Sequence, residues 1–302
     1  MSGHLGALTL LARDGIVERN AYPALSASCA VDSLAPSRRR AFVIPHACGG
    51  DGSAVYLCGN SLGLQPIRAR EFVLEELDRW GALGVEGHFR GDNPWVSIED
   101  TIVPGLAAIV GALPSEVAAM GSLTANLHHL MATFYTPTPD RYRILIEAHA
   151  FPSDAYAVKS QAALHGRSAA DAIVEVAPTP GSETIKGADL IAEILRTGPS
   201  LALVLLSGVQ YYTGQAFDIP AIVAAAHSVG AVVGIDAAHA VGNLPLELHA
   251  WNVDFAVWCS YKYLNAGPGG LGGLFVHEQH TAEGAPQRPL LAGWWGNRRC
   301  GC

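Results

Sequence analysis

Between residues 143 and 259, short aliphatic runs alternate with stretches of helical pattern. This alternation is typical of a parallel sheet, because each buried strand is a continuous apolar run and the helices that join the strands cover both faces. The predicted strands are 143–147, 172–176, 201–206, 232–236 and 255–259, and the predicted helices lie near 153–164, 188–195 and 219–228. We therefore predict an α/β fold with three α/β/α layers around a mostly parallel sheet.

The chain before this region has a different pattern. Residues 1–60 indicate an irregular N-terminal arm with short helices. Helices are expected at 67–83, where Val73, Leu77 and Trp80 recur at three- and four-residue steps, at 98–111, and from Thr124 onward. The prediction is an arm over 1–60, one large domain over 61–296 and a divergent tail over 297–302.

Composition excludes several classes of partner. The net charge of −8 leaves no basic surface for nucleic acid, and no apolar run approaches the roughly 20 residues of a membrane span. The six cysteines are scattered and form no zinc or disulfide framework, so we expect reduced thiols in a cytoplasmic protein, without a metal site.

Lys262 stands apart from the two other lysines of the chain. Lys159 and Lys186 lie in polar surroundings that suit solvated surface amines. Lys262 instead follows the apolar run 255–259, between Tyr261 and Tyr263. An apolar pocket disfavours the charged form of an amine and leaves a nucleophile. The alternative is a lysine at a strand end whose amine merely reaches solvent.

Asp236 ends the predicted strand 232–236, and His239 follows three residues later. A carboxylate at the end of a buried strand is costly unless it is paired, and the ring nitrogen of pyridoxal phosphate would provide a partner. An Asp-x-x-His by itself also fits an ordinary capped helix start. The lysine 26 residues further on makes the pair a candidate cofactor site.

Other polar and aromatic side chains are expected at the same edge of the sheet. Ser122 to Thr124 lead into a helix whose free N–H groups would hold a phosphate, although a simple N-cap explains them equally well. Phe151 could lie on a cofactor ring or belong to the core, and Ser207 and Tyr212 follow the strand 201–206.

Several motifs resemble those of kynureninase, a family of fold-type-I pyridoxal phosphate enzymes. The resemblance covers about residues 39–295 and rests on the segments 59–66 (GNSLGLQP), 123–128 (LTANLH), 151–154 (FPSD), 212–215 (YTGQ), 236–243 (DAAHAVGN) and 258–267 (WCSYKYLNAG).

The resemblance implies a role for each matching residue. Lys262 would hold the cofactor as a Schiff base and take the substrate's Cα proton, Asp236 would pair with the ring nitrogen, and Tyr212 would donate a proton. His88 and Ser61 would lie on the substrate side. The full set of implied cofactor contacts is Leu123, Thr124, Phe151, Asp154, Ser207, Asp236, His239, Tyr261, Lys262 and Trp294.

The implied activity is hydrolysis of L-kynurenine or 3-hydroxy-L-kynurenine to anthranilate or 3-hydroxyanthranilate plus L-alanine, in tryptophan catabolism and de novo NAD synthesis, by a homodimer. The alternatives are a desulfurase or aminotransferase of the same fold, and an inert subunit. The family continues beyond the motif at Trp294 with a small domain that supplies an arginine for the substrate carboxylate. The expectation is therefore a chain that lacks this domain and has little activity by itself.

Overall fold

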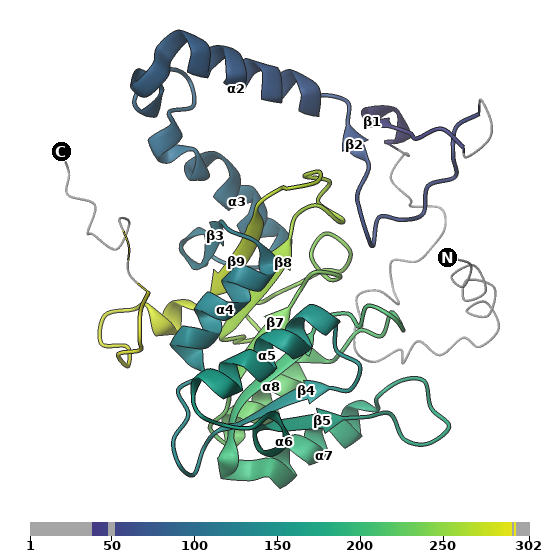
Figure 1. Ribbon diagram of the computed structural model, residues 1–302, viewed down its shortest axis with the longest axis vertical. Coiled ribbons are helices and arrows are strands. Elements are labelled where there is room, and N and C mark those ends of the chain that lie inside the picture. The colour runs from purple at the N-terminus through teal and green to yellow at the C-terminus, as the bar shows by residue number, and fades with distance from the viewer. Residues whose placement is uncertain (1–37, 48–51, 292, 294–302) are drawn as a thin grey trace. The chain divides into compact units, whose positions relative to one another are not determined.

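A seven-stranded sheet forms the centre of the computed structural model, which describes residues 38–47, 52–291 and 293. Its strands, in spatial order, are β3 (Val117–Ala119), β9 (Gly272–Val276), β8 (Phe255–Cys259), β7 (Val232–Asp236), β6 (Leu201–Ser207), β4 (Arg143–Glu147) and β5 (Ile173–Val176) (Figure 1). From β5 to β8 every pairing is parallel, whereas β9 is antiparallel to both of its neighbours. The mostly parallel sheet predicted from the sequence is confirmed.

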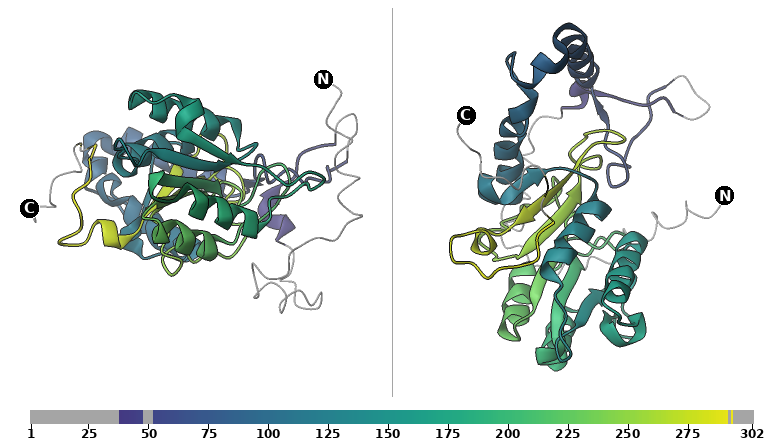
Figure 2. Two further views of the ribbon diagram at one scale, coloured as in Figure 1. Left: turned by 90° about the horizontal axis from the view of Figure 1, so that it is seen from below. Right: turned by 60° about the vertical axis from the view of Figure 1, so that its left-hand side comes forward.

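Helices cover both faces of this sheet (Figure 2). The helices of the described chain are α2 (Ala69–Leu83), α3 (Glu99–Val110), α4 (Leu123–Phe134), α5 (Pro152–Leu164), α6 (Ala169–Ala172), α7 (Gly187–Thr197) and α8 (Ile219–Ser228). Two separate apolar clusters divide the strand side chains. In β4, Leu145 belongs to the cluster of α3, α7 and α8, whereas Ile144 and Ile146 belong to the cluster of α4 and α5. Alternate strand residues therefore face opposite layers, which confirms the α/β/α architecture.

Local signals explain where two of the helices begin. Ser122 precedes α4, and its side chain accepts a hydrogen bond from Ala125 N at 3.3 Å. Asp218 caps α8 in the same way through Ala221 N at 3.2 Å. Both caps satisfy an N–H group that a helix start leaves without a partner.

The edge strand β3 and its neighbour β9 are the part of the sheet that the sequence prediction missed. Gly272 and Gly273 open β9 and carry no strand propensity. A Cβ at Gly273 would lie 2.3 Å from an indole carbon of Trp258 on β8, so the neighbouring strand requires glycine there. Other differences are small: β6 continues to Ser207, and Ala172 ends α6 and does not begin β5.

Several predicted regions are short or lie outside the described residues. In the arm, η2 (Arg39–Ala41) and β1 (Phe42–Val43) are described, and β1 pairs with β2 (Gln65–Pro66). The predicted tail 297–302 and the arm before residue 38 lie outside the described residues, so the domain boundaries stay a prediction.

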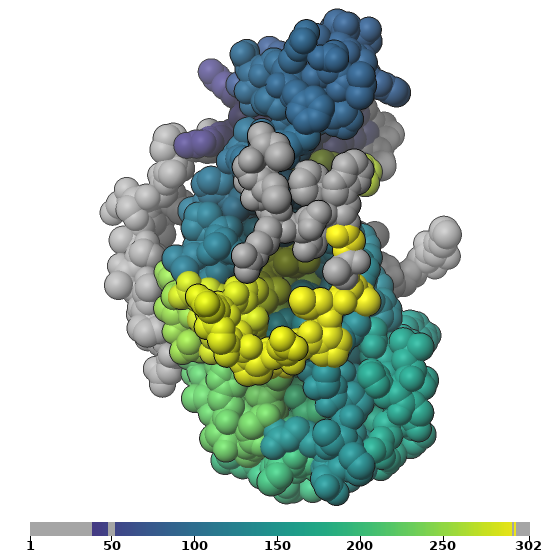
Figure 3. All heavy atoms as spheres, turned by 90° about the vertical axis from the view of Figure 1, so that its left-hand side faces the viewer, coloured from purple at the N-terminus to yellow at the C-terminus, as the bar shows by residue number. Residues whose placement is uncertain are grey.

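After β9 the chain passes through η7 (Glu278–His280) and runs along the surface, where it appears yellow in Figure 3. Of the helices that the structure describes, none has both the length and the apolar character that a membrane crossing requires.

Candidate active site

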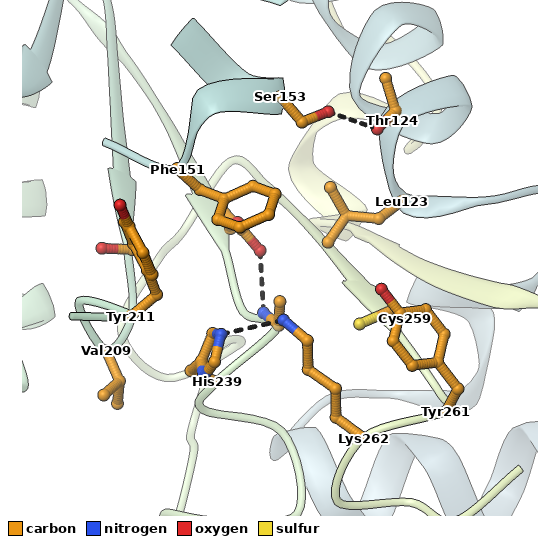
Figure 4. A pocket seen from close by; sticks show the side chains of 13 residues that line it. Leu123, Thr124, Phe151, Ser153, Val209, Tyr211, His239, Cys259, Tyr261 and Lys262 are labelled. Carbon is orange, nitrogen blue, oxygen red and sulfur yellow. Dashed lines mark hydrogen bonds between the residues drawn. The ribbon is translucent and has the colours of Figure 1, made fainter. Parts of the chain in front are cut away.

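A pocket lies at the carboxyl ends of β6, β7 and β8, facing the first turns of α4 and α5 (Figure 4). Ligands of open parallel sheets bind at this edge. Thirteen residues line it: Leu123, Thr124, Phe151, Ser153, Ser207, Val209, Tyr211, Asp236, Ala238, His239, Cys259, Tyr261 and Lys262.

Lys262 extends into this pocket from the segment after β8. Its Nζ lies 2.9 Å from Nε2 of His239, which follows β7 (Figure 4). Burial, reinforced by the positive charge of Lys262, lowers the pKa of His239 to about 4. At neutral pH the imidazole is therefore uncharged, and its Nε2 accepts a hydrogen bond from the amine. Phe151 lies near the same amine, with its ring centroid 5.8 Å from Nζ.

Three carboxyl groups lie in or near the pocket. Asp236 is buried, and its Oδ1 accepts a hydrogen bond from Ala238 N at 2.8 Å. Asp154 and Glu147 are buried near it. Burial, with the neighbouring charge of Asp236, raises the pKa of Asp154 to about 10, and burial also raises the pKa of Glu147. Asp154 is therefore protonated at neutral pH, and within the described chain its Oδ1 has no hydrogen-bond partner.

The first turn of α4 closes one side of the pocket. Ser122 satisfies Ala125 N, but among the described residues no acceptor takes the N–H groups of Leu123 and Thr124. The Thr124 hydroxyl lies 2.8 Å from that of Ser153, at the start of α5 (Figure 4). Two free N–H groups and two hydroxyls at a helix N-terminus form a site suited to an anion.

Aromatic side chains line the rest of the pocket. The rings of Phe151 and Tyr211 meet edge to face with centroids 5.2 Å apart. Tyr261 lies on the other side, where burial, with a further contribution from Cys259, raises the pKa of its phenol to about 12. Tyr261 is therefore a neutral hydrogen-bond donor at neutral pH.

A second cluster of ionisable groups lies outside this pocket. The side chains of His249, His277 and Glu116 each offer a ligand atom, and these atoms all lie within 4.8 Å of one another, the spacing of a possible metal site. Glu116, however, already accepts hydrogen bonds from His249 Nδ1 at 2.9 Å and from the backbone N–H groups of Leu113 and Glu278, both at 2.8 Å. The geometry is that of a hydrogen-bonded structural cluster.

Comparison with known proteins agrees with the geometry. The aminotransferase class-V family matches residues 160–293. Kynureninase from Salinispora tropica is 52% identical over 266 residues, which are 88% of this chain and 62% of that protein. Kynureninase from Nematostella vectensis is 53% identical over 250 residues, which are 83% of this chain and 53% of that protein. Over more than four fifths of its length, the chain is similar to these kynureninases. It spans a little over half of the length of these relatives.

Solved structures support the fold independently. The cysteine desulfurase CsdA from Escherichia coli superposes with a TM-score of 0.62 at 19% identity, over 80% of this chain and 57% of that protein. The cystine C-S lyase C-DES gives a TM-score of 0.56 at 21% identity, over 74% and 57%. At this level of identity the likeness extends to the fold alone.

Most cofactor contacts implied by the kynureninase resemblance meet in the pocket. Eight line it: Leu123, Thr124, Phe151, Ser207, Asp236, His239, Tyr261 and Lys262. Asp154 is buried near Asp236 and does not line the pocket, and Trp294 lies outside the described residues.

Three other predicted residues are not brought to the pocket. Tyr212 is 72% exposed, and its neighbour Tyr211 lines the pocket in its place. Ser61 is exposed, and so is His88, which lies in η3 (Gly84–His88) and packs its ring against Trp95. Their roles stay predictions.

The sequence reasoning also passed over residues that belong here. These are Ser153, Val209, Tyr211, Ala238, Cys259 and, beneath the pocket, Glu147. Glu147 carried a usable signal, because it ends a predicted strand as Asp236 does.

Proposed function

We propose that this chain is the cofactor-binding part of a kynureninase, a pyridoxal phosphate-dependent hydrolase of L-kynurenine or 3-hydroxy-L-kynurenine. The observation that carries the proposal is the arrangement of Lys262, His239 and Asp236 in one pocket. Pyridoxal phosphate needs an amine for its attachment and a carboxyl group to pair with its ring nitrogen, and this pocket offers both. The neutral imidazole would lie beside the cofactor ring. Identity of 52–53% to kynureninases supports this substrate class over the other chemistries of the fold.

The pocket fits pyridoxal phosphate at three points. The free N–H groups of Leu123 and Thr124 would hold the phosphate, Asp236 would pair with the ring nitrogen, and the Lys262 amine would hold the aldehyde carbon. The buried Asp154 near Asp236 does not line the pocket, and its Oδ1 has no hydrogen-bond partner among the described residues. When bound, the cofactor supplies a ring that accepts electrons from the substrate's Cα.

The residues of the chain would then position groups and move protons. Lys262 Nζ would take the proton from the substrate's Cα, and the neutral His239 would accept a hydrogen bond without competing for that proton. Phe151 would cover one face of the ring and keep water from it. We retain the predicted roles of Tyr212 as proton donor and of Ser61 and His88 on the substrate side.

We propose further that the protein acts as a homodimer. The support is α2, which buries none of its residues within the described chain. Its exposed apolar side chains are Phe72, Val73, Leu74, Leu77 and Trp80. An exposed apolar stripe of this kind is typical of an association surface, and a symmetric pair would cover it in both copies. Light scattering should give twice the chain mass, and a cofactor-loaded monomer would contradict the proposal.

The cytoplasm is the proposed location. Cys58 and Cys259 are both free thiols, which agrees with a reducing compartment.

The activity is tested with L-kynurenine and 3-hydroxy-L-kynurenine, following anthranilate or 3-hydroxyanthranilate by fluorescence after loading with pyridoxal phosphate. L-cysteine, with sulfide as product, and an amino-acid/keto-acid pair serve as parallel substrates. Anthranilate formation that Lys262→Ala abolishes supports the proposal. Sulfide or transamination without anthranilate would favour the desulfurase or aminotransferase alternative. Cofactor binding without any product would favour the inert subunit.

A further inference from the structure

Glu147 is a buried acid at the carboxyl edge of the sheet to which the proposed reaction gives no role. It ends β4 and is 2% exposed. The next strand, β6, ends in Ser207, which pairs in register with Asp236 of β7. Glu147, Ser207 and Asp236 therefore form a row across three adjacent strand ends, and the last two of them line the pocket.

Glu147 contacts this row through Ser207 alone. Its Oε1 lies 2.5 Å from Ser207 Oγ, and Ser207 N lies 3.4 Å from both carboxyl oxygens. Among the described residues no cation lies within ion-pair distance of Glu147. A buried carboxylate without a cation is costly, and the negative charge of Asp236 nearby adds to that cost. The neutral acid is the form that this environment favours.

The protonation of Glu147 decides how Ser207 can act. If Glu147 were ionised, the Ser207 hydroxyl would donate its hydrogen to the carboxylate and could only accept from a ligand. If Glu147 is neutral, its own O–H is able to donate to Ser207 Oγ, the reverse of the direction that a carboxylate imposes on this contact. The serine hydrogen is then free to turn toward the pocket.

We propose that Glu147 is a positioning residue of the cofactor site, a neutral acid that donates to Ser207 Oγ and so makes Ser207 a hydrogen-bond donor toward an oxygen of the bound cofactor. This inference rests on the proposed binding of pyridoxal phosphate. It assigns the row an order, in which Glu147 orients Ser207 and Ser207 contacts the cofactor.

The test compares Glu147→Gln, Glu147→Ala, Ser207→Ala and the double variant that combines the two alanine changes, all loaded with pyridoxal phosphate. The readouts are the apparent Kd from the visible absorbance band, the pH midpoint of that band and the melting temperature. The side-chain amide introduced by Glu147→Gln would still donate to Ser207 Oγ, so this variant should keep the parent's Kd and pH midpoint. Glu147→Ala and Ser207→Ala should each weaken cofactor binding by roughly three- to tenfold, the usual effect of losing one hydrogen bond. The double variant should be no weaker than either single one, because both changes remove the same contact.

Glu116→Gln is the matched control, since Glu116 is an equally buried and hydrogen-bonded acid outside the pocket. It should lower the melting temperature and leave the cofactor Kd unchanged. A purely structural role for Glu147 would give the same pattern in Glu147→Ala, with a lower melting temperature and an unchanged Kd, and would overturn the proposal.

The charge of Glu147 has its own readout. A nearby negative charge stabilises the protonated link between Lys262 and the cofactor, so removing such a charge would lower the pH midpoint of the visible band. A lower midpoint in Glu147→Gln would therefore show that Glu147 is ionised and would overturn the proposal. Ser207→Ala keeps the test decisive even if Glu147→Ala does not fold, because an unchanged Kd in Ser207→Ala also contradicts it. Absence of a visible band in the parent chain would instead refute the cofactor proposal itself.

Discussion

The amine of Lys262 and the imidazole of His239 lie 2.9 Å apart, although the two residues are 23 positions apart in the chain. The two side chains come from the ends of the neighbouring parallel strands β8 and β7. His239 is neutral because burial and the charge of Lys262 lower its pKa to about 4. The imidazole therefore orients the amine by accepting a hydrogen bond. It adds no positive charge beside the amine.

Lys262→Ala should abolish the visible absorbance band that appears when pyridoxal phosphate is added. The reason is that Lys262 is the lysine that lines the pocket, whereas Lys159 on α5 is exposed and Lys186 precedes α7. Lys159→Ala and Lys186→Ala are the controls and should keep the band. Borohydride reduction followed by peptide mapping locates the modified residue, and a pyridoxyl group on either control lysine would contradict the assignment.

Asp236→Asn should retain part of the cofactor binding and lose nearly all turnover in a version of the protein that hydrolyses kynurenine. An amide accepts the hydrogen bond from Ala238 N as the carboxyl group does, so the loop after β7 should keep its shape. It cannot, however, hold the ring nitrogen protonated. Steady-state kinetics measure the effect, and a kcat equal to that of the parent would reduce Asp236 to a structural residue.

The part of the fold that the sequence predicts well is the part whose signal is local. β4, β7 and β8 match their predicted bounds because strands buried on both faces are continuous apolar runs. β9 was missed because it begins with two glycines, of which Gly273 faces the indole of Trp258 on a different strand. The need for glycine at this position comes from a residue on the neighbouring strand, so the sequence around β9 does not predict it.

The site shows the same division. The rule that ligands bind at strand ends pointed to Asp236 and Lys262, and the structure brings both to one pocket. It also pointed to Tyr212, whereas Tyr211 lines the pocket, because both follow β6 and only the turn of the chain decides which ring faces Phe151. His88 packs its ring against Trp95 and does not line the pocket. Sequence spacing alone could not predict this position.

Asp254 should make stability depend on pH in two windows. Burial alone would raise its pKa, but hydrogen bonds from His227, His280 and Val233 N outweigh burial and hold the pKa at about 2. The unfolded value is about 3.9, so this carboxylate stabilises the fold above about pH 4, and the contribution is lost as the pH falls toward 2. The pKa of His227 is raised, chiefly by its hydrogen bond to Asp254. Its contribution is therefore present below about pH 6.5 and is lost as the pH rises through the folded value.

Urea unfolding at about pH 5.5 and about pH 8 tests the histidine window, since the two values lie on either side of the ordinary histidine pKa. Asp254→Asn should lower the free energy of unfolding by about 3 kcal/mol at the lower pH, because it leaves buried donors without their charged acceptor. His227→Gln should destabilise the protein more at the lower pH than at the higher one. Glu75→Gln, at an exposed position on α2, is the control and should have little effect at either pH. An equal loss at both pH values in His227→Gln would show that this histidine is not charged in the fold.

Gly234→Ala should destabilise the protein and weaken the site through packing. Gly234 lies in β7 opposite Phe255 of β8, and a Cβ at Gly234 would lie 2.2 Å from the tip of the Phe255 ring. That ring is fully buried and stacks on Phe134 at 5.0 Å, so it has little room to move. Overpacking of this kind costs about 1–3 kcal/mol.

Gly105→Ala is the matched control, because Gly105 lies inside α3 and a Cβ there would meet nothing within 4 Å. It should stabilise the protein by about 0.5–1 kcal/mol, since alanine is the better helix residue.

Gly234 also precedes Asp236 by two residues in the same strand. A backbone shift that relieves the clash should therefore weaken cofactor binding in Gly234→Ala and leave it unchanged in Gly105→Ala. Chemical unfolding and the cofactor Kd measure the two effects. A Gly234→Ala protein as stable as the parent would show that the Phe255 ring can move aside, and that the close packing of β7 on β8 does not fix the position of Asp236.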